Sequence, residues 1–247
     1  MPRRAREKSS TEIYHVMIRG INKQAIFNDA EDNEKFLEIV AECKAICEFD
    51  LYGYCLMGNH VHFLLKEGKE KLEQVFKRIG TRYVYWYNKK YMRIGHLFQD
   101  RYKSEPVESE PYFMVVLRYI HQNPKKAGIC KSIDAYAWSS YQNYLGKRGI
   151  VDVEFAMDVI GKDNFIAFMN KETDDICLED NEKIIMLSDT ELINVIEEKY
   201  KINPKMIQNE PKEAMNEILK SILNLEGVTT RQLSRVTGVS VNKIWTL

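Results

Sequence analysis

Two histidines separated by one residue, His60 and His62, have side chains and a spacing that could bind a metal ion. They lie in an alternating stretch that predicts a strand, and in a strand residues two apart point to the same face. Two imidazoles on one face can share a divalent cation and leave coordination positions open for a phosphate. The alternative is simple packing, because a histidine is more often packed than ligating. The spacing alone does not choose between the two.

A second pair, Tyr119 and Asn123, lies near the end of a predicted helix. Residues four apart share a helical face, so a phenol nucleophile and an amide ligand could reach the same ion. The alternative is that Tyr119 packs and Asn123 caps the helix, since Pro124 disfavours helical geometry at the residue before it. His96 and His121 are further candidates for ligands or proton shuttles, and for both we favour a structural role.

Hydrophobic periodicity predicts the elements that must position these residues. Alternating apolar residues indicate strands, with Gly58-Asn59 as the turn of a hairpin. Helical spacing indicates three helices, the last beginning at Pro111 and stopped by Pro124. This order predicts an α+β domain with helices packed on an antiparallel sheet, against which His15 packs. The expected strands span 12–19, 51–57, 60–65 and 95–102. The first expected helix begins near Asp29 or Asp32 and includes Cys47, and the other two span 72–91 and 111–122.

From about residue 151 the sequence becomes acidic and helical, which predicts a linker over 151–184 and a helical domain over 185–247. Two short helices separated by Thr237-Gly238-Val239, with Ser240 as the cap of the second, are typical of a helix-turn-helix. A helical packing or dimerisation module is the alternative. In the helix-turn-helix interpretation, Val241, Asn242 and Lys243 begin the recognition helix. The expected helices of this domain span 192–200, 214–225, 230–236 and 240–247.

The composition fits a protein with a real core: 247 residues, 45% hydrophobic and 29% charged. The net charge of zero hides an asymmetry, because residues 1–150 hold 25 Lys and Arg against 18 Asp and Glu, and the rest holds 11 against 18. A surface that binds a polyanion is therefore expected in the first part. The five cysteines include no CxxC pair, and no apolar run predicts a membrane span or signal peptide, so we expect a cytoplasmic protein.

Three motifs in order, Met57–Leu64, Gly95–Lys103 and Arg118–Pro124, resemble the REP-associated tyrosine transposases, which are single-tyrosine relatives of the HUH transposases. The segment Tyr14-His15-Val16 and the start of the chain are similar to the same family, so the resemblance covers roughly residues 1–145. It implies an HUH nuclease domain of ferredoxin- or RRM-like fold over 1–150.

The resemblance also implies roles for individual residues. His60 and His62 would bind Mg²⁺ or Mn²⁺, and Asn123 matches a position from which the family offers a polar third ligand. Tyr119 would attack a phosphate of single-stranded or hairpin DNA, leaving a 5′-phosphotyrosine and a free 3′-OH. Such an enzyme acts as a monomer or a homodimer, and the sequence leaves that choice open.

Two other functions remain open at this point. The chain could be a DNA-binding regulator derived from such an enzyme, or a metal-dependent phosphoesterase that uses water and forms no covalent adduct. Cations interleaved with aromatic residues over 77–93 fit single-strand binding, although an ordinary amphipathic helix explains them too. The candidate phosphate contacts are Arg3, Arg4, Arg6, Arg19, Lys77, Arg82, Lys89, Lys90, Arg101, Lys103, Lys125 and Lys126.

Overall fold

The computed structural model describes residues 6–99, 101–173, 175, 177, 178, 189–223, 225, 228 and 230–245. The chain divides into two compact units, Met1–Glu179 and Asp180–Leu247, which we describe separately. Within the described ranges, no helix combines the length and apolar character that a membrane crossing requires.

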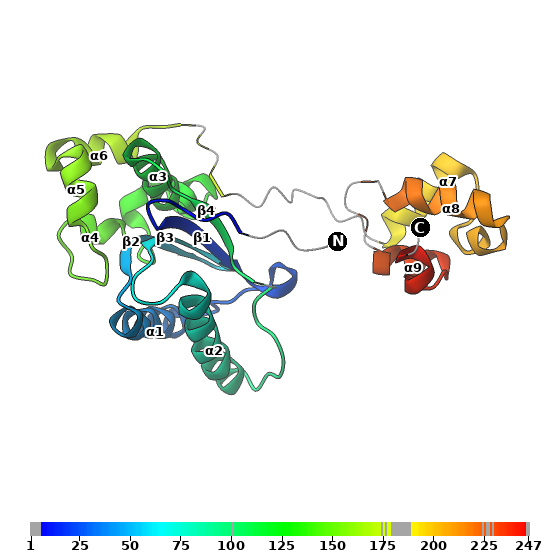
Figure 1. Cartoon of the computed structure of the whole chain (residues 1–247), viewed down its shortest axis with the longest axis horizontal. Coiled ribbons are helices and arrows are strands. Elements are labelled where there is room, and N and C mark those ends of the chain that lie inside the picture. The colour runs from blue at the N-terminus through cyan, green and yellow to red at the C-terminus, as the bar shows by residue number, and fades with distance from the viewer. Residues whose placement is uncertain are drawn as a thin grey trace. The chain divides into compact units, whose positions relative to one another are not determined.

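The first unit is built on a four-stranded antiparallel sheet with the strand order β2-β3-β1-β4 (Figure 1). The expected hairpin is confirmed, because β2 and β3 are joined through Gly58 and Asn59 and pair directly. The expected α+β class is confirmed as well. The strands are β1 (Ile13–Arg19), β2 (Asp50–Met57), β3 (His60–Lys66) and β4 (Lys103–Pro106).

One face of the sheet is covered by α1 (Ala30–Cys47) and α2 (Leu72–Lys90), which lie on the same side in Figure 1. Alternate residues of β1 and β3, such as Val16 and Phe63, are buried against these helices. Asp29 caps α1 by accepting a hydrogen bond from the backbone of Asp32. This face carries the larger apolar core of the unit.

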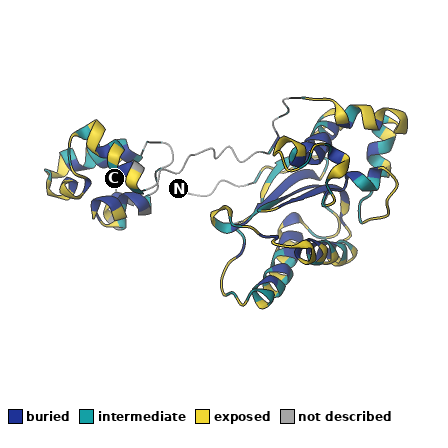
Figure 2. Ribbon diagram, turned by 180° about the vertical axis from the view of Figure 1, so that it is seen from behind, coloured by how far each residue is buried: buried dark blue, intermediate teal, exposed yellow. Residues whose placement is uncertain are grey.

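The opposite face is covered by α3 (Glu110–Lys126), which starts at the N-cap Ser109 with a proline in its first turn. Two further helices, α5 (Glu154–Ile160) and α6 (Lys162–Asn170), pack on this side through a shared apolar core. Figure 2 shows that the strands are largely buried between the two helical layers. The shorter helices of this unit are η1 (Ile21–Lys23), η2 (Ile133–Ala135) and α4 (Tyr141–Tyr144).

The strand expected over 95–102 is wrong. The last strand is β4, over Lys103–Pro106, and the segment before it forms only an isolated bridge between Phe98 and Gly20. That segment lies beyond Arg19, where β1 has already ended, so β1 offers it no continuous ladder. The actual strand is a short, polar edge strand that ends in proline, and apolar alternation does not indicate such a strand.

The end expected for the third helix is also wrong, because α3 continues through Pro124 to Lys126. A proline inside a helix removes one hydrogen bond and costs roughly 3 kcal/mol. Here Pro124 itself is buried, and the neighbouring apolar face of α3 packs on the sheet. Asn123 therefore keeps helical geometry and stays on the face that carries Tyr119.

The linker expected over 151–184 is wrong in its first part. Phe165 and Met169 of α6 and Ala156 of α5 are buried in the same core as α3, so these helices belong to the first unit. Net acidity misled the prediction, because the charged residues lie on the outer faces while the apolar ones pack. The remainder of the expected linker, including 179–188, falls largely outside the described residues.

The second unit is helical and has its own apolar core, which includes Leu192, Leu219, Leu233 and Ile244. The two final helices meet at Gly238, whose φ of 77° favours glycine. Ser240 caps the last helix by accepting a hydrogen bond from Lys243 N at 3.4 Å. The elements are α7 (Asp189–Tyr200), η3 (Pro204–Asn209), α8 (Lys212–Leu223), α9 (Thr230–Thr237) and α10 (Val241–Trp245).

Candidate active site

His60 and His62 lie on the face of the sheet that α3 covers. Their partners in the antiparallel register of β1 are Arg19 and Met17, which therefore point to the same side. The two imidazole rings have centroids 5.0 Å apart. His60 directly follows the hairpin turn, and its Nδ1 lies 2.7 Å from the side-chain oxygen of Asn59.

Tyr119 of α3 lies directly against this pair. Its ring centroid is 5.7 Å from that of His62 and also 5.7 Å from that of His15 on β1. The tyrosine is 5% exposed, and the ammonium group of Lys126 lies 5.7 Å from its ring centroid. The structure thus brings together a phenol and two histidines that are 57 or more positions away in the sequence.

Asn123 lies one helical turn beyond Tyr119 on α3 and is half-buried. Because residues four apart share a helical face, Asn123 lies on the same face of α3 as Tyr119. Its backbone carbonyl accepts the hydrogen bond of Ala127 N at 2.9 Å, as expected within a continuing helix.

Burial keeps both candidate ligands neutral. Desolvation, with a smaller contribution from the charge of Arg19, lowers the pKa of His60 to about 4. Desolvation also holds the pKa of His62 well below its usual value, and the neighbouring His15 acts in the same direction. At pH 7 both imidazoles are therefore unprotonated, which is the state that binds a metal ion.

The donor set fits a divalent cation that is bound by two imidazoles. The Nδ1 atoms of His60 and His62 face hydrogen-bond partners, Asn59 Oδ1 and His15 Nε2, so each ring has its Nε2 left for an ion. The described residues contain no group of three or more His, Cys, Asp or Glu side chains that could hold a metal ion. Other ligands would have to be an amide, water or the substrate phosphate.

The remaining candidate histidines lie elsewhere. His121 is fully buried, with Nε2 2.8 Å from Ser140 Oγ and its ring between those of Tyr141 and Tyr144. His96 is exposed in the segment before β4. Neither is among the rings that contact Tyr119.

Sequence reasoning missed two residues of this site. His15 was expected only to pack, yet its Nε2 lies 3.0 Å from His62 Nδ1. Glu105 of β4 pairs with His15 in the sheet register, and its Oε2 lies 3.8 Å from His15 Nδ1. Knowing that β1 lies between β3 and β4 would have revealed both, because the strand order places all three residues on one face.

The candidate phosphate contacts divide between the two faces of the sheet. Arg19 pairs with His60, and Lys103 pairs with Met17, so both lie on the face of the histidines. Lys125 and Lys126 end α3 on this side and are exposed. These cations lie on the side of the candidate site, and one of them, Lys125, has an acidic partner in Glu172 at 3.2 Å.

The cations of α2 lie with that helix on the opposite face, and two of them already have acidic partners. Lys90 Nζ lies 2.8 Å from carboxylates of Asp29, Glu31 and Asp32, and Arg82 lies 2.8 Å from Glu42. Lys77 and Lys89 are exposed. Arg3 and Arg4 fall outside the described residues.

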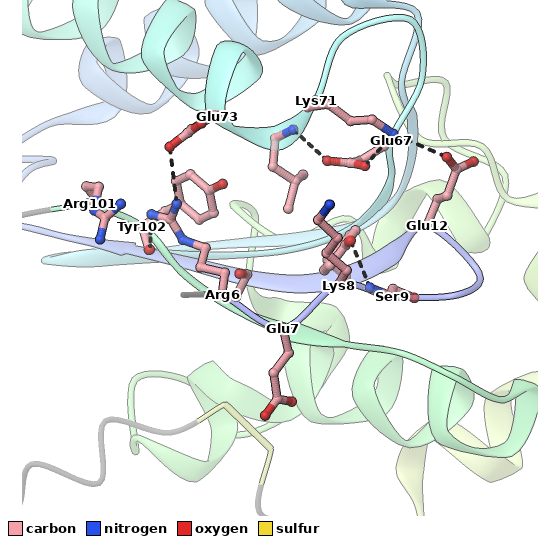
Figure 3. Close-up of a pocket in the computed structure, with 13 residues that line it drawn as sticks. Arg6, Glu7, Lys8, Ser9, Glu12, Glu67, Lys71, Glu73, Arg101 and Tyr102 are labelled. Carbon is pink, nitrogen blue, oxygen red and sulfur yellow. Dashed lines mark hydrogen bonds and ion pairs between the residues drawn. The ribbon is translucent and has the colours of Figure 1, made fainter. Parts of the chain in front are cut away.

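A separate cavity of about 430 Å³ lies near the start of α2, and Figure 3 shows its mixture of basic and acidic side chains. Arg6 stacks on Tyr102 at 3.7 Å and lies 3.7 Å from Glu73. Lys71 pairs with Glu67 at 3.0 Å, and Arg101 is also part of the lining. The lining contains neither of the two histidines nor Tyr119, so this cavity is distinct from the candidate site.

Comparisons with known proteins give one family match and two similar solved structures. Residues 8–123 match the family model described as transposase, IS200-like. A solved REP-associated tyrosine transposase bound to a REP hairpin has 16% sequence identity and a TM-score of 0.53, covering 64% of this chain and 93% of that one. A candidate transposase from Deinococcus radiodurans has 15% identity and a TM-score of 0.35, covering 44% and 88%. A comparison with curated proteins gives no match.

The family model covers both histidines, Tyr119 and Asn123, and the first solved structure shows the same fold. The resemblance to the single-tyrosine transposases, and with it the expectation of a transposase enzyme, is thereby confirmed. Residues 8–123, the greater part of the first unit, match the IS200-like transposase family.

Proposed function

We propose that this transposase is a metal-dependent single-strand DNA endonuclease and strand transferase that uses Tyr119 as its nucleophile. The observation that supports this most directly is the contact between the Tyr119 ring and the His62 ring, at 5.7 Å between centroids. A phenol and two imidazoles from distant segments meet at one face of the sheet. Neutral imidazoles beside a phenol fit phosphoryl transfer better than either feature alone.

In this mechanism His60 and His62 would hold Mg²⁺ or Mn²⁺, and Asn123 would supply an amide ligand. When bound, the ion polarises the scissile phosphate and neutralises developing charge, which a phenol of pKa about 10 needs at neutral pH. The Tyr119 oxygen bonds to phosphorus and gives up its proton. The bond from phosphorus to the 3′ oxygen breaks, and that oxygen takes a proton.

The products are a 5′-phosphotyrosine and a free 3′-OH. The phosphodiester energy stays in the phosphotyrosine bond, so a 3′-OH from the same or another strand can attack it without ATP. This reversibility is what strand transfer requires, and it distinguishes the proposal from hydrolysis by water.

We propose that the substrate is a hairpin-forming DNA strand and that the protein acts on it in the cytoplasm. The support is the fold shared with a transposase that was solved on a REP hairpin, together with the cations around the site. Arg19, Lys103, Lys125 and Lys126 are the phosphate contacts closest to the histidines by face and element. Phosphate contacts of this kind give affinity without reading sequence.

For the second unit we propose duplex binding through α9 and α10, with Val241, Asn242 and Lys243 at the start of the recognition helix. The turn at Gly238 and the cap at Ser240 support the helix-turn-helix interpretation. The domain plan is therefore a nuclease domain over 1–150, extended by α5 and α6, and a helical DNA-binding domain over 185–247.

Covalent capture tests the nuclease proposal. The full chain is incubated with end-labelled hairpin DNA and Mn²⁺, and protein-bound label is measured after denaturing electrophoresis. Tyr119→Phe should abolish both adduct and cleavage, because the ring stays and only the nucleophilic oxygen is removed. Tyr85→Phe is the matched control, since Tyr85 is 74% exposed on α2 and should leave both unchanged.

The alternative functions give different outcomes in the same assay. Cleavage without any adduct would favour a phosphoesterase that uses water. Tight duplex binding with no cleavage of any single-stranded substrate would favour a regulator. An adduct that persists in Tyr119→Phe would exclude Tyr119 as the nucleophile.

A further inference from the structure

A fully buried histidine, His15, lies within hydrogen-bond distance of the candidate metal ligand His62. His15 on β1 is 0% exposed and His62 on β3 is 2% exposed. The two strands are neighbours, and His15 Nε2 lies 3.0 Å from His62 Nδ1, a hydrogen-bond distance between ring nitrogens. One of these nitrogens must carry the proton and the other must accept it, so the contact selects a tautomer for each ring.

The far side of His15 faces a carboxylate. Glu105 on β4 is the register partner of His15, and its Oε2 lies 3.8 Å from His15 Nδ1. Both atoms are buried and have no hydrogen-bond partner in the structure, and at 3.8 Å they face each other just beyond hydrogen-bond distance. The other carboxylate oxygen, Oε1, accepts a hydrogen bond from the hydroxyl of Tyr112. Glu105 is thus held in place with one oxygen directed to His15.

We propose that Glu105 and His15 are positioning residues that fix His62 as its Nδ1–H tautomer, so that Nε2 is the lone pair offered to a divalent cation. The role of this ligand rests on the function proposed above. The tautomer itself rests only on the contacts between the three side chains.

The positions of the protons in the series Glu105, His15 and His62 follow from the carboxylate at one end of it. We call this series the relay. An ionised carboxylate only accepts hydrogen bonds, so Glu105 draws the His15 proton to Nδ1. His15 Nε2 is then an acceptor, and His62 must donate from Nδ1. In the reverse arrangement, a lone pair on His15 Nδ1 would face the carboxylate, and His62 would carry a proton on the nitrogen needed for the ion. Contact with His15 lowers the pKa of Glu105, which agrees with an ionised carboxylate.

Such partners have measurable effects on metal binding. Removing the hydrogen-bond partner of a ligating histidine typically weakens metal affinity by roughly 10–100-fold, because the ring loses its orientation and its tautomer. His60 has its own partner in Asn59, so the two ligands are oriented independently. The effect of His15 should therefore act through His62 alone.

The first test is nitrogen NMR of the metal-free full chain labelled at its five histidines, which reads tautomers without DNA or metal. In the wild type, His62 should carry its proton on Nδ1. His15→Leu removes the acceptor and should give a mixture of tautomers. His15→Gln keeps an acceptor oxygen near the lost Nε2 and should restore the Nδ1–H form. Glu105→Gln, whose amide donates as well as accepts, should also give a mixture.

Mn²⁺ binding by the same full-length proteins is the second readout. His15→Leu should bind Mn²⁺ roughly 10–100-fold more weakly, and His15→Gln should recover most of the loss. His121→Leu is the matched control, because it removes an equally buried histidine whose partner is Ser140, and it should leave affinity unchanged.

A wild-type His62 protonated on Nε2 would overturn the proposal, and so would an unchanged tautomer in His15→Leu. A change in His15→Leu without one in Glu105→Gln would remove Glu105 from the relay. If the tautomers behave as expected but the wild type neither binds Mn²⁺ nor cleaves DNA, the proposed function fails while the positioning by His15 stands.

Discussion

At the scale of single residues, the two sheet histidines are expected to be needed for cleavage of the DNA and not for its binding. His60→Ala and His62→Ala should each abolish hairpin cleavage in Mn²⁺ while DNA binding, measured by gel shift, changes little, because Lys and Arg supply the phosphate contacts. His96→Ala is the control, since His96 is exposed and is not among the rings that contact His62 or Tyr119. Loss of DNA binding in parallel with cleavage would argue that the histidines hold the fold or the DNA.

A second expectation at this scale concerns acid stability. Burial lowers the pKa of His121 to about 3, whereas in the unfolded chain it is near 6.5. Between these values the unfolded state binds one more proton, so this histidine makes the fold less stable as pH falls below 6.5. From pH 7 to pH 5 the loss is about 2 kcal/mol for this group.

The measurement is the free energy of opening at β3 amides, obtained from hydrogen exchange at both pH values. His121→Gln, which can still bond to Ser140, should lose less free energy between pH 7 and pH 5 than the wild type does. Equal losses in the two proteins would show that His121 does not titrate as burial requires.

Residue types and spacing predicted part of the site. His60 and His62 follow from strand alternation, and Tyr119 with Asn123 follows from helical spacing. That the pairs meet could not be derived from spacing, because it depends on α3 packing on one face of the sheet; the family resemblance supplied it. His15 and Glu105 escaped notice because their contact depends on the order β3-β1-β4.

At the scale of elements, the position of α3 decides where Tyr119 lies. Gly53 of β2 lets this helix approach closely, since a Cβ there would lie 2.7 Å from the Leu117 Cδ1 atom of α3. Gly53→Ala should therefore cost roughly 1–3 kcal/mol through overpacking and reduce adduct formation. Thermal unfolding and covalent capture measure the two effects.

Gly58→Ala is the matched control, because a Cβ at Gly58 meets nothing within 4 Å. It should leave both stability and adduct formation near the wild-type values. If Gly53→Ala behaves like this control, α3 does not depend on the close approach at β2.

Periodicity predicted the elements that bury a regular apolar face, such as β1, β3, α1 and α2. It failed for the elements whose existence or length depends on tertiary contacts. β4 is polar and exists because the edge of β1 is open to pairing. α3 passes Pro124, which is itself buried, and the preceding part of the helix packs in the apolar core. In α5 and α6, the many charged residues led to the prediction of a linker, although each helix has apolar residues that pack in the same core as α3.

At the scale of the whole molecule, the chain joins a basic nuclease part to an acidic helical part, and the second unit should bind duplex DNA independently of cleavage. Lys243→Glu, at the exposed start of α10, should weaken duplex binding in low salt while cleavage of hairpin DNA persists. Lys220→Glu, exposed on α8, is the control with the same charge change. Equal effects of the two substitutions would indicate general charge and not a recognition helix.

The central claim is that Tyr119 and the histidines of β3 form one nuclease site, and locating the covalent adduct tests it most directly. After reaction with hairpin DNA and Mn²⁺, the protein is digested and the tryptic peptide 119–125, which contains Tyr119 as its only tyrosine, is examined by mass spectrometry. We expect a nucleotide joined through its 5′ phosphate to Tyr119. An adduct on another residue, or cleaved DNA with an unmodified peptide, would contradict it.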